Sequence, residues 1–363
     1  MRISPVSSLL LLLLSLCSLA QAQIKVVRYD ATAANDFGIV YSLPVTELRV
    51  TCYVKKEAVI PGKLSAYAQR FLGEEAPLAS VRYKIEDIFL STEGQPDSNA
   101  RFLALFRQGK RTGYLTCTAD GVIESINGDS DFSSLGKEQK PLPSNDIPSF
   151  VTAALPQEYV LATSDFKRAE IAANKLFELR EDLLTIVSGK SDRMPQDGKA
   201  MEIATQTLRE QIASLEELFL GHKEVTYEAY EARYIPYDNT NQHILFRFSP
   251  FYGVVAPNDL SGAPVYLSVT IRESAPLLTE KEAAQKERKL KGIVYRIPGR
   301  ASVLINGKGV KPLQSEVELG QIGSLEALTE RVDMRKDEDL QVYFDTATGA
   351  IRSIRSSNSL LQQ

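Results

Sequence analysis

The sequence contains no tryptophan and only two histidines, His222 and His243, and these shortages exclude several kinds of site. Without tryptophan there is no indole platform for sugars, although the 15 tyrosines can stack on sugar rings as well. A Ser-His-Asp nucleophile would need one of the two histidines. Neither has the aspartate three residues before it that Gly-Asp-Ser esterases require, so we expect no such triad.

Metal sites are equally hard to build from these residues. Zinc needs three or four His, Cys or carboxylate ligands, and no His-Glu-x-x-His or Cys-x-x-Cys spacing occurs. Asn127, Asp129 and Asp131 alternate, with Glu138 at the twelfth position, as in a calcium loop. Phe132 replaces the glycine that such a loop needs at its sixth position, so a solvated polar loop is the stronger interpretation. We therefore assign no catalytic residue, no cofactor-binding residue and no metal ligand.

The chain also lacks a large excess of either positive or negative charge. The 46 acidic and 42 basic residues are interspersed and leave a formal net charge of only -4. A nucleic-acid-binding chain would show a basic patch or stripe, so we expect no nucleic acid as a partner. After the N-terminal segment no stretch is long and apolar enough for a transmembrane helix.

The N-terminus has the features of an export signal. Arg2 precedes the apolar run from Leu9 to Leu19, and small residues at Ala20 and Ala22 fit cleavage after Ala22. A lipoprotein anchor on Cys17 is the alternative, but Leu16 is large for the position before a lipidated cysteine. We expect an exported protein, located in the periplasm, associated with the outer membrane or extracellular.

Two cysteines remain after cleavage, Cys52 and Cys117. Each lies in a strand-like segment and points to its apolar side. An oxidising compartment allows them to form a disulfide, and two buried free thiols are the alternative.

The stretch from Ser164 to Gly221 predicts an antiparallel helical hairpin. In each arm the apolar residues recur every three or four positions. The first arm carries Phe166, Ala169, Ala173, Leu176, Leu179, Leu183 and Ile186; the second carries Met201, Ala204, Leu208, Ile212, Leu215 and Phe219. Ser164 or Asp165 can cap the start, Gly189 and Gly221 can end the arms, and Pro195 lies in the polar segment between them. We expect the two stripes to pack against each other and onto a sheet, with Leu184, Val187 and Leu220 available for a second contact.

The rest of the chain alternates in the manner of strands. The expected organisation is a signal peptide over 1–22, a β-rich region over 23–128, a connection over 129–163, the hairpin over 164–221 and a second β-rich region over 222–357. Because no βα alternation occurs, the fold class is α+β, with two β-rich regions flanking a long antiparallel helical hairpin.

Several segments carry a family resemblance. They are GIVYSLPVTELRV, AYAQRFLG, KIEDI, LFELREDLLTIVSG, LEELFLG, FRFSPFYGVVAPNDLSGAPVYLSV and GIVYRIPGRASVLI. In this order they resemble the domain of unknown function 4831 family, which consists of exported proteins of Gram-negative gut and oral bacteria. The resemblance covers nearly the whole chain after the signal. It implies export but transfers no functional residue, and the cysteine pair does not belong to its pattern.

The leading functional hypothesis is a non-enzymatic binding or structural module of the cell envelope, with an envelope protein or a glycan as partner. It rests on the absence of a credible nucleophile, metal or cofactor constellation. The alternative is a hydrolase of envelope or dietary glycans acting through two carboxylates, such as Glu86-Asp87 or Glu216-Glu217. The sequence gives no indication of oligomeric state.

Export can be tested on the protein itself. N-terminal sequencing of the protein recovered from the envelope fraction should begin at Gln23, because signal peptidase cleaves after the small residue Ala22. A chain that begins with a lipidated Cys17 would support the anchor instead, and an uncleaved cytoplasmic chain would refute export.

Overall fold

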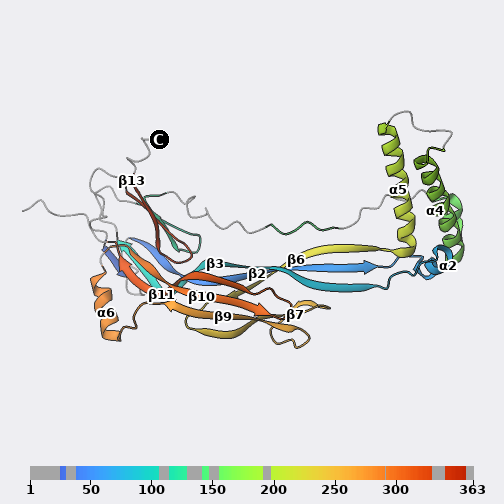
Figure 1. Cartoon of the computed structure of the whole chain (residues 1–363). Helices are drawn as coiled ribbons and strands as arrows, with labels where there is room; N and C mark the ends of the chain where they lie inside the picture. Colours follow the sequence, from blue (N-terminus) through green and yellow to red (C-terminus); the bar gives the residue numbers. More distant parts are fainter. Residues whose placement is uncertain are drawn as a thin grey trace, which may run out of the picture.

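The protein is rich in β-structure and strongly elongated (Figure 1). The computed structural model describes residues 25–29, 38–105, 114–128, 141–146, 155–190, 198–290, 292–328 and 340–356. The strands are β1 (Lys25–Arg28), β2 (Gly38–Ile60), β3 (Ser80–Leu105), β4 (Leu115–Cys117), β5 (Ile123–Ile126), β6 (His222–Tyr234), β7 (Thr240–Ser249), β8 (Gly253–Val255), β9 (Ala263–Glu273), β10 (Val294–Gly307), β11 (Leu313–Ala327), β12 (Leu340–Phe344) and β13 (Ile351–Ser356). The helices are the 3-10 turn η1 (Ser65–Tyr67), α2 (Ala68–Leu72), α3 (Gln157–Leu161), α4 (Asp165–Val187), α5 (Gly198–Leu220) and α6 (Glu280–Lys289).

Three antiparallel sheets make up the β-structure. The first has the strand order β1-β3-β2-β6, the second β11-β10-β9-β7-β8, and the third β13-β12-β5-β4. β2 and β3 are 23 and 26 residues long and pair along almost their whole length, which gives the first sheet its ribbon shape (Figure 1).

The first two sheets pack face to face over half of the ribbon. Along β2 the alternate residues Leu48, Val50, Cys52 and Val54 point to the second sheet, as the two-residue period of a strand requires. They meet an apolar layer from β7, β9 and β10 that includes Phe246, Leu267 and Val303, all fully buried. A second core lies at the other end of the body, where Tyr41, Phe102, Ile123 and Phe344 join the first and third sheets.

Beyond Val54 and Ile85 the ribbon continues without a core. We name this part the neck; it consists of residues 55–60 of β2, 80–84 of β3 and 222–227 of β6. None of its residues is buried. Among the described residues no second layer covers the neck, so it is held mainly by the hydrogen bonds between its three strands, to which Asp146 adds a pair with Val225 of β6 (Figure 1).

The far end of the neck carries a group of helices that we name the head, residues 61–79, 155–190 and 198–221. The Ser164 hydroxyl caps α4 by accepting a hydrogen bond from the Lys167 N–H (3.2 Å), and Gly189 follows with a positive φ of 70°. The alanines of α4 pack against η1 and α2, and its leucines pack against α5. The buried residues are Leu64, Ala68, Ala169, Ala172, Ala173 and Phe219 in one cluster and Leu176, Leu179, Ile212 and Leu215 in the other.

These contacts correct the expected fold class. The α+β arrangement of two β-rich regions flanking a long antiparallel helical hairpin is wrong: strands make up 50% and helices 24% of the described residues, and the two β-rich regions share their sheets. β2 pairs with β6, so that Leu48 lies opposite Tyr234, and β5 pairs with β12. Helices α4 and α5 do not cover a sheet either, because their buried apolar residues pack against each other and against η1 and α2.

Shorter elements follow the sequence more closely. Gly73 ends α2 with a φ of 74°, and a bulge at Glu86-Asp87, where the alternation of apolar residues in the sequence slips, occurs at the register shift between Tyr53 and Val54. The charged segment after Thr279 forms helix α6, which begins with reciprocal hydrogen bonds between Thr279 and Glu282. The signal segment 1–22 lies outside the described residues.

A buried turn joins the three sheets. Residues 345–349 connect β12 to β13, and the Asp345 carboxylate accepts the N–H groups of Ala347 (2.8 Å) and Thr348 (3.0 Å). A Cβ atom on Gly94 would lie 1.8 Å from the carbonyl oxygen of Thr346, so only glycine allows this approach. The sequence Asp-Thr-Ala-Thr-Gly is typical of a turn, but it does not indicate that Thr348 and Gly349 are buried.

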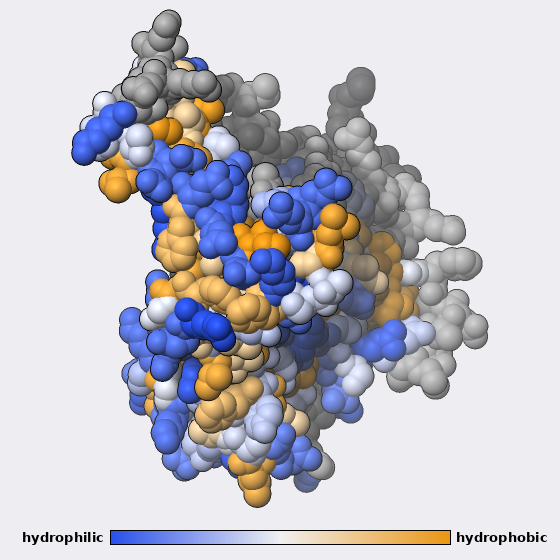
Figure 2. All heavy atoms as spheres, turned by 90° about the vertical axis from the view of Figure 1, so that its right-hand side faces the viewer, coloured by the Kyte–Doolittle hydropathy of each residue, from blue (hydrophilic) through white to orange (hydrophobic). Residues whose placement is uncertain are grey.

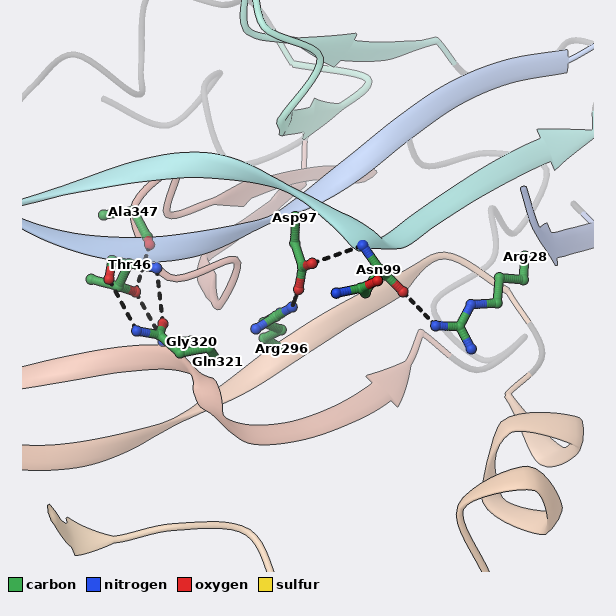
Figure 3. A network of polar contacts seen from close by, with 8 residues as sticks. All are labelled: Arg28, Thr46, Asp97, Asn99, Arg296, Gly320, Gln321 and Ala347. Carbon is green, nitrogen blue, oxygen red and sulfur yellow. Dashed lines mark hydrogen bonds and ion pairs between the residues drawn. The ribbon is translucent and has the colours of Figure 1, made fainter. Parts of the chain in front are cut away.

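Thr46 of β2 binds this turn and β11 at once (Figure 3). Its hydroxyl donates to the Ala347 carbonyl (2.8 Å) and accepts the Gly320 N–H (2.9 Å). Its N–H and carbonyl bond to the Gln321 side chain at 2.9 and 3.0 Å. All polar atoms of this buried threonine therefore have partners, as a polar residue in an interior requires.

Arg296 of β10 makes the second link, to Asp97 of β3, at 2.5 Å (Figure 3). Their side chains are 6% and 16% exposed, so this is a buried ion pair. Burial lowers the pKa of the Arg296 guanidinium, and the charge of Asp97 opposes that shift. The Arg296 N–H also donates to Gly349 of the buried turn (2.9 Å).

The ion pair predicts a stability effect. Asp97→Asn should lower the free energy of unfolding by about 3 kcal/mol, because it leaves the buried Arg296 charge uncompensated. The measurement is urea unfolding at neutral pH. Glu273→Gln is the matched control, since the pair of Glu273 and Arg300 is 67% and 62% exposed; its effect should stay below about 0.5 kcal/mol. Equal effects of the two substitutions would contradict the assignment.

Candidate functional site

The carboxylates singled out in the sequence are held in ion pairs where the head meets the neck. Glu216 faces Arg180 of α4 at 2.6 Å. Glu217 lies 2.7 Å from Nδ1 of His222, whose Nε2 is 3.1 Å from Glu224. His222 follows the end of α5, as expected, and ties this helix to β6. The pair Glu216-Glu217 therefore braces the head against the neck rather than facing across a cleft.

Three further glutamates share the face of the ribbon that points away from the second sheet. They are Glu47, Glu93 and Glu231, one from each of β2, β3 and β6. Arg49 binds Glu93 and lies 3.8 Å from Glu231, while Arg233 lies 3.7 Å from Glu47. Because the arginines alternate with the carboxylates, the cluster is charge-compensated, and cross-strand pairs of this kind stabilise a sheet.

The remaining candidates also lie apart. Glu86 and Asp87 occupy the bulge of β3, and His243 of β7 packs its ring 4.5 Å from that of Tyr234. Asn127 has a φ of 56° and accepts the Tyr114 N–H, while Asp129, Asp131 and Glu138 of the calcium-like loop lie outside the described residues. Within the described ranges no three His, Cys, Asp or Glu side chains are grouped as metal ligands would be.

The two cysteines are free thiols that lie in different clusters. Cys52 is fully buried in the core between the first two sheets, and Cys117 packs against the core that includes Tyr41. Of the two alternatives that the sequence left open, the structure contains the free thiols. Burial raises the pKa of Cys52 to about 12. Burial and the nearby Glu124 raise that of Cys117 to about 11.

The outer end of the head is the strongest candidate for a functional surface. Leu184 and Val187 of α4 are 68% and 60% exposed, and Ile203 of α5 is 60% exposed. Seen from the head, hydrophobic side chains interrupt the hydrophilic surface (Figure 2). The sequence singled out Leu184 and Val187 because they lie off the main stripe. It missed Ile203, which faces away from the buried stripe of α5.

Leu220, the third residue singled out for a second contact, is used inside the head. It packs, half-buried, against the cluster of Leu64, Ala68 and Phe219. No buried residue occurs in α4 after Leu179 or in α5 before Ile212. The described parts of the two helices are thus anchored at the neck and open at the outer end, which an interaction site requires. Among the described residues, the helices include none with the length and apolar character that a membrane crossing demands.

The raised thiol pKa values predict slow thiol chemistry. At pH 8.5, where an ordinary cysteine is about half ionised, both thiols should stay neutral and resist a disulfide reagent, because the thiolate is the reactive form. Unfolding in guanidinium chloride should release two reactive thiols per mature chain. Fast reaction of either thiol in the native protein would contradict its burial.

Comparison with known proteins identifies the family of the chain but gives no activity. No curated protein and no solved structure matches the chain. A family model described as "Domain of unknown function (DUF4831)" matches residues 37–352, which run from the start of β2 through the neck and the head to the start of β13 and leave out β1. The chain therefore belongs to the DUF4831 family, in agreement with the resemblance seen in its sequence.

Proposed function

We propose that the protein is an exported, non-enzymatic module of the cell envelope that binds a protein partner through the outer end of its head. The observation that carries this proposal is the position of Leu184 and Val187. They are exposed on a helix that the neck holds away from the body (Figure 1). Exposed apolar side chains gathered at one place are typical of interaction sites. The export signal in the sequence supports the cellular location.

The ion pairs favour binding over hydrolysis. A glycosidase needs two carboxyl groups facing each other across a cleft, one of them as an acid. Glu216 and Glu217 instead face Arg180 and His222, and the glutamates of the ribbon alternate with arginines. These carboxylates are thus occupied by basic partners within the fold and do not face one another across a cleft, which favours binding over hydrolysis.

The head surface predicts a loss of binding in a double variant. Leu184→Asp with Val187→Asp should reduce the capture of a partner from envelope extract by about thirtyfold or more, because two interface anchors that each contribute more than about 1 kcal/mol are lost. Both side chains are exposed, so the thermal unfolding temperature should not change. The measurement is quantitative affinity capture on the immobilised full chain.

The matched control places the same charges elsewhere. Leu277 and Leu278, in the segment before α6, are 102% and 44% exposed. Leu277→Asp with Leu278→Asp should leave capture unchanged. A partner that is lost with this control and kept by the head variant would move the interface to the body and refute the proposal.

A further inference from the structure

The turn between β7 and β8 presents two neighbouring aromatic side chains to solvent. Phe251 is 60% exposed and Tyr252 is 69% exposed. The turn lies against β3 at the point where the second sheet ends and the neck begins, so the rings adjoin the uncovered part of the ribbon. Single exposed apolar residues are common on soluble proteins, but adjacent exposed rings leave a larger apolar area in water and point to a ligand.

The backbone of this turn is fixed. The Tyr83 N–H of β3 donates to the Pro250 carbonyl (2.9 Å), and the Phe251 N–H donates to the hydroxyl of the buried Ser249 (3.3 Å). Gly253 follows with a φ of 75°, and a Cβ atom there would lie 3.1 Å from the Tyr83 ring. The rings of Phe251 and Tyr252 are thus carried on a held backbone, which lowers the entropy lost on binding.

Two cations flank these rings. The guanidinium carbon of Arg82 lies 5.4 Å from the centre of the Phe251 ring, and Nζ of Lys56 lies 6.0 Å from the centre of the Tyr83 ring. Lys56 is directly opposite Tyr83 in the pairing of β2 with β3. Tyr83 and Lys56 therefore share one face of the ribbon, and Arg82, the preceding residue of β3, reaches the Phe251 ring beside them.

Neither cation is neutralised. Glu57, which lies opposite Arg82 in the register, is bound by Lys55 at 2.7 Å. In the part of the chain that the structure describes, no carboxylate lies within ion-pairing distance of Arg82 or Lys56. By contrast Arg49, Arg180 and Arg296 each face a carboxylate. Arg82 and Lys56 can therefore offer their charge to a ligand that stacks on the neighbouring rings.

We propose that Tyr83, Phe251 and Tyr252, with Arg82 and Lys56, form a binding site for a glycan that carries carboxylate groups. The C–H face of a sugar ring is apolar and stacks on an aromatic ring, while its carboxylate pairs with a guanidinium or an ammonium group. Because both rings of the turn are exposed, they are accessible to a sugar. This aromatic turn site is separate from the outer end of the head and does not depend on the function proposed for it.

Calorimetric titration of the full chain with a hexamer of galacturonic acid tests the site, with neutral cellohexaose as the matched probe. The uronate hexamer should bind, more weakly at higher salt because screening reduces the attraction between exposed charges. Phe251→Ala with Tyr252→Ala should weaken binding by about tenfold, as loss of stacking does at other aromatic platforms. Arg82→Gln should weaken it by about fivefold, because a charge-assisted hydrogen bond is lost, and should reduce the salt dependence.

Two control variants remove the same chemistry elsewhere. Phe177→Ala removes an aromatic ring of the head that is 46% exposed, and Lys308→Gln with Lys311→Gln removes two exposed cations of the body. Each should change the affinity by about twofold or less, because distant surface sites act independently. The head variant of Leu184 and Val187 should bind the uronate hexamer normally, which separates failure of this site from failure of the head.

Three results would overturn the proposal. The first is no binding of the uronate hexamer at millimolar concentration. The second is equal weakening by the aromatic and the control variants. The third is binding of anionic phospholipid vesicles or of DNA that is lost in the Phe251 and Tyr252 variant while no uronate binding is found, since this would assign the rings to a membrane or a nucleic acid.

Discussion

Strand β2 is the element on which the rest of the structure depends, because it is paired on both sides from Leu48 to Val59. β3 follows it in sequence, whereas β6 returns to it only after the head has been completed. Within the body these strands also have a core to pack on, formed by residues such as Val50 and Cys52. In the neck they have none, so the paired backbone groups must support the head largely on their own. An unpaired backbone N–H or C=O group in these strands would cost free energy wherever water cannot reach it.

The head is joined to this ribbon by close backbone contact. The Leu64 N–H donates to the Leu218 carbonyl at 2.7 Å. A Cβ atom on Gly62 would lie 2.3 Å from the Glu217 carbonyl oxygen, so α5 can approach only because glycine is there. His222 adds contacts to Glu217 and Glu224 at the same place. The proposed partner site and the aromatic turn site thus lie at opposite ends of one braced neck.

How much of this could be predicted from the sequence follows from how far each interaction reaches along the chain. The helix stripes, the cap at Ser164 and the left-handed glycines depend on residues a few positions apart, and these predictions are confirmed. The pairing of Leu48 with Tyr234 joins residues far apart in sequence, and no periodicity encodes it. For this reason the expected separation into two β-rich regions was wrong.

The buried surfaces show the same limit. Asp345 and the residues after it have an ordinary turn composition, and only their contacts with Thr46 and Arg296 reveal that the turn lies inside. Cys52 and Cys117 both alternate correctly with their neighbours, yet they enter different cores. Leu184 and Val187 were found because they depart from the helix stripe, whereas Phe251 and Tyr252 follow no pattern that marks them as exposed.

The neck has mechanical properties that follow from its single layer. A single layer of strands resists bending within the plane of the sheet, because such bending would stretch the strand at one edge and compress the strand at the other. The layer bends more readily out of this plane, because no buried side chains of the neck oppose that motion. The neck therefore bends more easily out of the plane of its sheet than within that plane. A force applied to the head will therefore move the head chiefly perpendicular to the sheet of the neck. The three twisted strands of the neck will oppose this motion.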